Sequence, residues 1–443
     1  MKFSPGVVAF VLATVAVARA QAPDPAIMSE IRKIRAIDNH SHPPRVVSDG
    51  ERDDEFDALP CDPLQPTDPN TVTRPENPQY LAAWKALWGY AYEDRSDAHV
   101  KELLAAKNKI RQEQGDNYPA WVLDRLGIDV EFANRVAMGR GLDAAHYRWV
   151  PFDDALLFPL HNDALAAETP DRKFFFGRED TLLARYRRDL AVAASPATLA
   201  EYTARVVTPE LERQKKEGAV AFKFEAAYLR SLDFEPASEQ DAAAIYAKYA
   251  AGHVHPAKDE YTRLQDYLFR YVAAEAGRLG LPVHIHTGEG CGGYFYLQGS
   301  NPVLLESVLN DERLRKTTFV LLHGGAGPYS REISYLLMKP NVYTDLSEQT
   351  WLETPHRLAE VLRDWLEWYP EKILFGTDLY PGSGAYDWEE IGWQTSQTAR
   401  QALGIALTGM LQDGEITVQR ANEIARMVLR ENAVKLYHLA DQR

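Results

Sequence analysis

The sequence has 443 residues, of which 45% are hydrophobic and 11% aromatic. This length and composition supply enough apolar surface for a large core and exclude an intrinsically disordered chain. The net charge is −15 at pH 7, and no block of lysine and arginine stands out, which argues against a nucleic-acid partner.

The first residues have the pattern of a secretory signal peptide. An apolar stretch over 7–17 is followed by Ala18-Arg19-Ala20, the small-x-small pattern of a signal-peptidase site. We therefore predict a signal peptide over 1–20 and an exported protein, periplasmic or secreted, that begins near Gln21. The apolar stretch is shorter than the ~20 residues that span a bilayer, so no membrane association is expected after its removal.

Two cysteines, Cys61 and Cys291, are present. Two are too few for a disulfide scaffold or for a zinc module built on four cysteines. In an oxidising compartment the two could pair, and two separate thiols are the alternative.

Short β-rich segments alternate with longer helical patterns along the rest of the chain. The β-rich segments are 34–40, 128–134, 149–160, 219–225, 281–287, 318–324, 341–347 and 372–378. Strands that alternate with helices predict a parallel sheet, and eight such units close a (β/α)8 TIM barrel. Barrels of more than ~400 residues carry insertions. We predict one domain over 21–443, with a helical cap-like insertion over 47–116.

Polar residues follow the predicted strands at the end where this barrel builds its active sites. His40 and His42 lie on one face of the first strand, because side chains alternate with period two. The groups expected to converge are His40, His42, Lys223, His286, His323 and Asp378. Several imidazoles and a carboxylate suit Zn²⁺, with Mn²⁺ or Fe²⁺ as alternatives. Such an ion lowers the pKa of its water toward ~7, and Asp378 could take up the proton.

Four motifs carry a resemblance to a known family: DNHSH at 38–42, LPVHIHTGEG at 281–290, LLHGGAG at 321–327 and ILFGTD at 373–378. In this order they resemble the amidohydrolase superfamily, family 2 branch, which includes amidohydrolase-like domains fused to glutamine-synthetase-like proteins.

The resemblance implies a set of metal ligands. It implies ligation by His40, His42, His286 and Asp378, and His323 would bind metal or polarise a substrate carbonyl. It also implies that Lys223 is either a carboxylated bridge between two ions or a cation for a substrate carboxylate. One or two ions therefore both fit the sequence.

Other residues near the strand ends are interpreted separately. We expect substrate contacts from Arg45, Tyr228, Arg230 and Glu289. The arginine fork suits a carboxylate, although pairing with a loop aspartate is the alternative. His284 is expected one layer deeper than His286, as a core or supporting histidine, and Asp345 and Ser347 are expected to hydrogen-bond neighbouring loops. The G-x-G-x-x-G match over 288–293 is weak, and no nucleotide is expected there.

These residues predict an exported metal-dependent hydrolase that cleaves an amide, isopeptide or lactone bond of a small carboxylate-bearing substrate. A metal-dependent non-oxidative decarboxylase is the first rival, and a catalytically silent ligand-binding barrel is the second. A binding module has no need for all six groups at the strand ends, which argues against the second rival. The sequence is compatible with a homo-oligomer and does not identify the substrate.

Overall fold

The computed structural model describes residues 22–48, 50–64, 67–68, 72–252 and 254–439. The predicted signal peptide lies outside the described residues. Within the described ranges, no helix combines the length and the apolar character needed to cross a membrane.

Eight strands form where the sequence predicts β-rich segments. They are β1 Ala36–Ser41, β2 Ile128–Asn134, β3 Tyr147–Val150, β4 Phe222–Phe224, β5 Val283–Gly288, β6 Phe319–Ala326, β7 Val342–Asp345 and β8 Ile373–Leu374. The third segment was predicted over 149–160, and this boundary is wrong. Pro151 follows β3 directly and has no N–H for the ladder, and a 3₁₀ turn over Asp154–Leu157 takes up the next residues.

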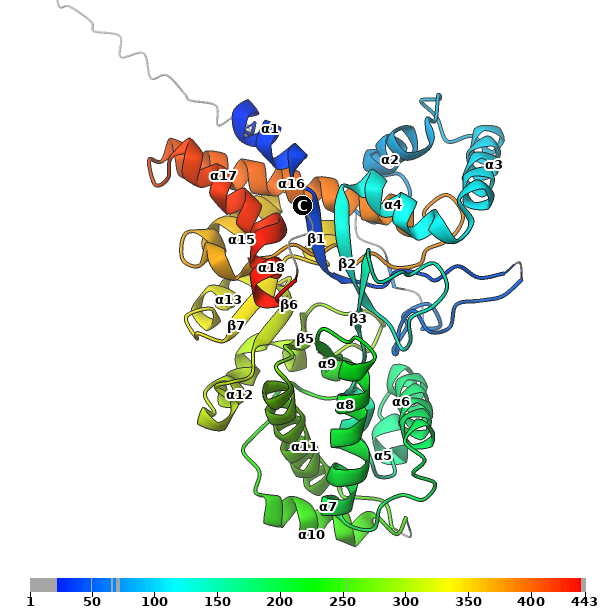
Figure 1. The fold of residues 1–443 in the computed structure, drawn as a ribbon, viewed down its shortest axis with the longest axis vertical. Coiled ribbons are helices and arrows are strands. Elements are labelled where there is room, and N and C mark those ends of the chain that lie inside the picture. Colours follow the sequence, from blue (N-terminus) through cyan, green and yellow to red (C-terminus); the bar gives the residue numbers. More distant parts are fainter. Residues whose placement is uncertain (1–21, 49, 65–66, 69–71, 253, 440–443) are drawn as a thin grey trace, which may run out of the picture.

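The strands are all parallel and form a closed ring. They pair in the orders β1-β2-β3 and β4-β5-β6-β7-β8, and backbone hydrogen bonds join the two sheets on both sides. These bonds run from Val220 N to Trp149 O (3.0 Å), Lys223 N to Pro151 O (2.9 Å), Asn39 N to Phe375 O (2.8 Å) and Asp378 N to His40 O (2.8 Å). The predicted TIM barrel is confirmed (Figure 1).

Helices surround the ring and extend from it. Before β4 they are α1 Pro25–Lys33, α2 Pro78–Trp88, α3 Asp97–Gln114, α4 Tyr118–Leu126, α5 Asp163–Ala166, α6 Pro170–Asp189, α7 Leu199–Tyr202 and α8 Thr208–Lys216. After β4 they are α9 Ala226–Leu229, α10 Glu239–Tyr249, α11 Lys258–Leu279, α12 Glu306–Leu309, α13 Ser330–Leu336, α14 Gln349–Leu352, α15 Pro355–Leu366, α16 Trp388–Gln412, α17 Val418–Arg426 and α18 Asn432–Leu436.

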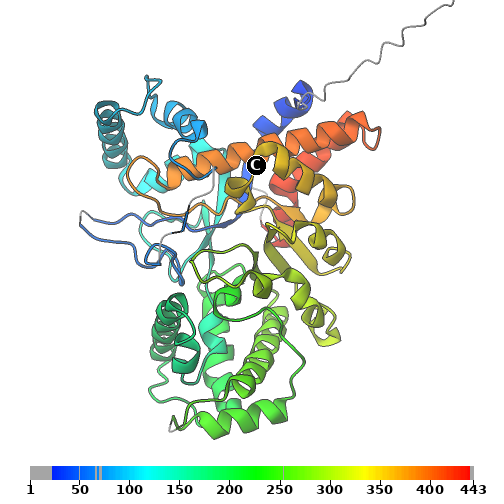
Figure 2. The same cartoon turned by 180° about the vertical axis from the view of Figure 1, so that it is seen from behind.

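The segment between β1 and β2 contains the predicted insertion. Its first part is irregular, and its helix α2 packs against α16 (Figure 2), which α3 reaches through the side chain of Lys107. Lys107 donates to Glu390 Oε2 at 2.7 Å, and Trp88 donates to Glu390 Oε1 at 2.6 Å. Since α16 follows β8, these contacts fix the insertion beside the loop that carries Asp378.

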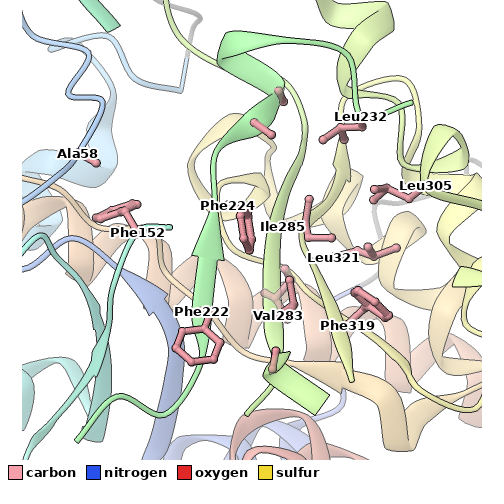
Figure 3. Packing of buried hydrophobic residues seen from close by; sticks show 14 of the residues in the cluster. Ala58, Phe152, Phe222, Phe224, Leu232, Val283, Ile285, Leu305, Phe319 and Leu321 are labelled. Atoms are coloured by element: carbon pink, nitrogen blue, oxygen red, sulfur yellow. The ribbon is translucent and has the colours of Figure 1, made fainter. Parts of the chain in front are cut away.

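Successive side chains of each strand point alternately to the core between the strands and the helices and to the inside of the barrel. Figure 3 shows Phe222 and Phe224, Val283 and Ile285, and Phe319 and Leu321, which belong to the core beneath the helices. The residues between them face the inside of the barrel, where Val320 and Leu322 join a smaller apolar cluster. The same alternation turns Lys223, His284 and His286 inward.

Candidate metal centre

The mouth of the barrel brings the predicted polar groups together. Asp378 Oδ1 lies 3.0 Å from His40 Nε2 and 3.4 Å from His42 Nε2. The ring centroid of His323 lies 4.9 Å from that of His40 and 4.6 Å from that of His286. The four histidines are at most 6% exposed. Four buried imidazoles and one carboxylate therefore lie close together at the mouth.

Lys223 lies in β4 on the same inner face. Its side chain is fully buried, and its Nζ lies 3.9 Å from Glu225 Oε1. Its charge acts on the imidazoles of His40, His284 and His286. The structure therefore places all six predicted groups in one region.

His323 is held by a chain of hydrogen bonds that determines its tautomer. Ser347 Oγ donates to Asp345 Oδ1 at 2.7 Å and lies 2.9 Å from His323 Nδ1. Because the serine proton is directed to Asp345, Ser347 accepts a proton from His323 Nδ1, which leaves Nε2 with a free lone pair. Asp345 Oδ1 also accepts from the backbone N–H of His323 at 2.8 Å.

His286 is fixed in a similar way by the loop after β5. Its Nε2 lies 2.7 Å from the carbonyl oxygen of Glu289. A carbonyl can only accept, so Nε2 carries the proton and Nδ1 is free to act as a ligand. The ring of Tyr228 packs 4.8 Å from that of His286, so Tyr228 and Glu289 both adjoin the histidines.

The donor atoms fit a divalent cation. One ligand atom each of His40, His323 and Asp378 lies within 4.8 Å of the others, and the same holds for His286, His323 and Glu348. Neither ring nitrogen of His40 has a hydrogen-bond partner although the side chain is buried. A buried polar atom without a partner is costly, and a cation between these donors would remove that cost.

Protonation states also suit a metal. Burial and the charge of Lys223 lower the pKa of His286 to about 3 and hold the pKa of His40 well below its ordinary value. Burial raises the pKa of Asp378, but His323 and His42 outweigh this effect and hold that pKa below its ordinary value. At neutral pH His40 and His286 are therefore neutral and Asp378 is ionised, which is the state that binds metal.

Backbone strain gathers at the same place. His323, Glu348 and Asp378 have φ values of 65°, 60° and 55°, in the left-handed region that non-glycine residues rarely adopt. Such strain persists where the surrounding structure enforces it and is concentrated at functional sites. Gly324 follows His323 because a Cβ there would overlap the ring of Trp365.

A family model named Amidohydrolase matches residues 193–439, more than half of the chain. The chain belongs to the amidohydrolase family. The resemblance seen in the sequence motifs is thus confirmed.

This amidohydrolase is similar in sequence to a protein of a filamentous fungus. Protein fluG of Emericella nidulans is 30% identical over 234 residues, which are 50% of this chain and 26% of that protein. The chain thus spans about a quarter of the relative's length.

Solved structures share the fold at low identity. A protein from Lactobacillus casei named as a metal-dependent hydrolase has a TM-score of 0.57 and 18% identity, and covers 94% of this chain and 98% of its own. Glucuronate isomerase of Caulobacter crescentus has a TM-score of 0.59 and 15% identity, and covers 83% and 76%. Uronate isomerase of Thermotoga maritima has a TM-score of 0.54 and 13% identity, and covers 94% and 98%.

The two arginines predicted to bind substrate have protein partners in this amidohydrolase. Arg230 donates to Asp266 Oδ1 at 2.7 Å and to Gln265 Oε1 at 3.0 Å, and it also donates to backbone carbonyls. Arg45 Nε lies 3.3 Å from Asp53 Oδ1. Arg45 thus has the pairing with a loop aspartate that was the alternative interpretation, whereas the aspartate that pairs with Arg230 lies in α11.

Three carboxylates at the mouth were not among the predicted site residues. Glu348 joins the group of His286 and His323, and Asp57 and Glu225 form a group with His42. Two of them had a signal in the sequence: Glu225 lies two residues after Lys223, and Glu348 follows the seventh strand. Asp57 comes from the insertion and had no such signal.

Proposed function

We propose that this amidohydrolase is a metal-dependent hydrolase that cleaves an amide, isopeptide or lactone bond of a small molecule. The observation that carries the proposal is the convergence of one ligand atom each of His40, His323 and Asp378 within 4.8 Å, with neither ring nitrogen of His40 in a hydrogen bond. His286 and Glu348 complete the donor set. A divalent cation such as Zn²⁺, Mn²⁺ or Fe²⁺ would supply activation of water and polarisation of the scissile carbonyl when bound.

The chain's own residues would handle the proton and orient the reacting groups. Asp378 is ionised and lies at the mouth, so it can accept a proton from water and return it to the leaving group. Ser347 and Asp345 hold His323 in one orientation. Their hydrogen bonds keep the imidazole aimed at the site, where it can bind the ion or stabilise developing negative charge.

A cavity beside the mouth supports a small-molecule substrate. It has a volume of about 650 Å³ and is lined by residues that follow His42 and Asp378, among them Pro44, Arg45 and Pro381, with Arg111 of α3. This volume lies in the range of small-ligand sites. Because Arg45 and Arg230 already have partners, the proposal does not include a carboxylate on the substrate.

The test compares the protein with its His40→Ala variant across dipeptides, γ-glutamyl amides, N-acyl amino acids and lactones. We expect the variant to lose one bound metal ion and at least ~100-fold in turnover, because even supporting residues of metal sites are worth 10–100-fold. His356→Ala, on the exposed surface, serves as the control. A His40→Ala enzyme that is fully active without metal would contradict the proposal, and release of CO2 would favour a decarboxylase.

We also propose that the protein is exported, to the periplasm or out of the cell. Cys61 and Cys291 form a disulfide, and this supports the proposal because disulfides persist in oxidising compartments. N-terminal sequencing of the mature protein is expected to begin near Gln21. An intact Met1 on protein found only inside the cell would contradict it.

A further inference from the structure

Carboxylates gather on the loops around the barrel mouth. Glu289 follows β5, and Glu348 and Glu353 flank the short helix α14 after β7. The carboxylate of Glu289 interacts electrostatically with those of Glu348 and Glu353, so the loops after β5 and β7 come together at the mouth. Glu348 is 4% exposed, and its Oε2 has no hydrogen-bond partner. Excess negative charge thus extends outward from the metal centre.

The insertion adds a further carboxylate on the side of β8. Asp62 interacts electrostatically with Tyr380, which follows Asp378 by two residues. Within the part of the chain that the structure describes, the side chains of Asp62 and Glu289 make no hydrogen bond or ion pair. Two carboxylates at the mouth are therefore free to contact a ligand.

The cations near the mouth do not balance these carboxylates. Lys223 is fully buried inside the barrel, where its charge acts on the imidazoles, and Arg45 and Arg230 have the aspartate partners described above. Arg52 acts on Asp62, and Arg357 lies 3.8 Å from Glu353. The side chains of these two arginines are 82% and 68% exposed, so water screens their charges. None of the five offers a free charge to an anionic group at the mouth.

Two aromatic rings lie beside the carboxylates. Trp351 belongs to α14, between Glu348 and Glu353, and its ring centroid lies 5.9 Å from that of Tyr380 in edge-to-face geometry. Tyr380 is 36% exposed, and Trp351 Nε1 is buried without a hydrogen-bond partner. An aromatic face attracts a positive charge, and tryptophan does so most strongly. The free Nε1 can in addition donate to an acceptor on a ligand.

The wall on the side of β5 is also aromatic. The ring of Tyr228 lies 5.1 Å from that of Phe295, and Phe295 lies 6.2 Å from the ring of His286. A Cβ at Gly290 would overlap the ring of Phe295, so the loop after β5 packs directly on this ring. An apolar group that carries a charge therefore finds an apolar surface close to the carboxylates.

We propose that five residues at the mouth, Asp62, Glu289, Trp351, Glu353 and Tyr380, form a rim that recognises a protonated amine on the substrate. This rests on the proposed function, because the amine belongs to the substrate of the same metal centre. Ammonium groups bind aromatic faces and donate charge-assisted hydrogen bonds to carboxylates. The net charge of −15 also draws cations toward the protein. The substrate class is an amide with a free amino group, such as a small peptide or an aminoacyl amide, and an ammonium replaces the carboxylate that the sequence suggests as the recognised group.

Two probes of the same shape test the charge preference without turnover. Phenethylammonium and phenethyl alcohol share the ring and the chain but differ in charge at neutral pH. Isothermal titration calorimetry of the full-length, metal-loaded protein measures the affinity of each. We expect one ammonium probe per chain, bound at least ~10-fold more tightly than the alcohol, because the cation–π contact and the charge-assisted hydrogen bond both require the charge.

Variants assign this preference to the rim. Glu289→Gln and Glu353→Gln are each expected to lower the ratio of the two affinities by about 3-fold and to leave the affinity for the alcohol unchanged. Trp351→Leu is expected to weaken the binding of both probes. Glu371→Gln is the matched control and should keep the wild-type ratio, because Glu371 is exposed but precedes β8, at the opposite end of the barrel.

The outcomes separate the rim from the proposed reaction. Thermal melts show that each variant is folded before it is titrated. A wild-type protein that binds both probes equally, or an unchanged ratio in both glutamine variants, would overturn the proposal. For a hydrolysed peptide, kcat/KM is expected to exceed that of its N-acetylated form, and the reverse order would also contradict the proposal. If no substrate is hydrolysed, the proposed function fails, whereas the affinity ratio of the probes still decides whether the rim recognises an amine.

Discussion

At the scale of single residues, the histidines of the mouth are kept as ligands by what their other nitrogens contact. Ser347 accepts from His323 Nδ1 and donates to Asp345 Oδ1, and the carbonyl of Glu289 accepts from His286 Nε2. In each ring one nitrogen is anchored and the other stays free. Removing an anchor should therefore weaken metal binding without removing a ligand.

Ser347→Ala tests this anchoring. The variant frees His323 Nδ1 and leaves Asp345 one donor short, so metal affinity is expected to fall by about 10–100-fold. The measurement is competition with a chelator of known affinity. Ser334→Ala is the matched control, because Ser334 is also buried but donates to the carbonyl of Asp364. Equal metal affinity in the two variants would show that Ser347 does not position His323.

The sequence could place those residues whose position follows from side-chain alternation in a strand and from the location of active sites in TIM barrels. His286 and Lys223 fall on the inner face because side chains alternate, and the rule that active sites follow the strands selects the right end of the barrel. Asp57 could not be placed, because its contact with His42 depends on how an irregular loop returns to the mouth. The sequence also does not identify Asp53 as the partner of Arg45, eight residues away, or Asp266 as the partner of Arg230, 36 residues away.

At the scale of elements, the strands were predicted well because short β-rich segments alternate with longer helical patterns, whereas the loops were not. The third segment shows the limit: 149–160 is apolar except for Asp153 and Asp154, and periodicity alone cannot separate its strand from the 3₁₀ turn after Pro151. Pairing of the two cysteines was also open in the sequence. It depends on two loops, after β1 and after β5, that are 230 residues apart in the chain but bring their Cα atoms to 5.9 Å.

This disulfide should stabilise the mouth of the barrel. Crosslinking residues so far apart removes much conformational freedom from the unfolded chain, and native disulfides are typically worth about 2–4 kcal/mol. Reduction is therefore expected to lower the free energy of unfolding by that amount, measured by urea unfolding with and without reductant. The double variant Cys61→Ser/Cys291→Ser is the control and should not respond to reductant. A wild-type protein equally stable in both conditions would contradict the expectation.

At the scale of the whole molecule, the C-terminal segment connects the floor of the barrel to the metal centre. Ala433 of α18 belongs to the apolar cluster inside the barrel, and Val434, Leu436 and Tyr437 pack against it. The Tyr437 hydroxyl donates to Asn39 Oδ1, and Asn39 Nδ2 donates to Asp345 Oδ2 at 2.9 Å. A continuous set of hydrogen bonds thus runs from the last helix to the residue that anchors Ser347.

His284 lies in the middle of this region, and its charge state couples the fold to pH. Its Nε2 lies 2.7 Å from the Tyr437 hydroxyl, and burial together with Lys223 lowers its pKa from 6.5 to about 3. Below pH 6.5 the unfolded chain takes up a proton that the folded protein refuses, so the contribution of His284 to stability is full above pH 6.5 and is lost as the pH falls toward 3. In metal-free protein this loss is at most about 1.4 kcal/mol per pH unit. Urea unfolding between pH 7.5 and pH 5 measures it, and His284→Gln, which cannot titrate, should show a slope smaller by up to one proton. Identical slopes in the two proteins would mean that His284 takes up its proton equally well in the folded and unfolded states, and the buried connection to Tyr437 would then have no role in the pH response.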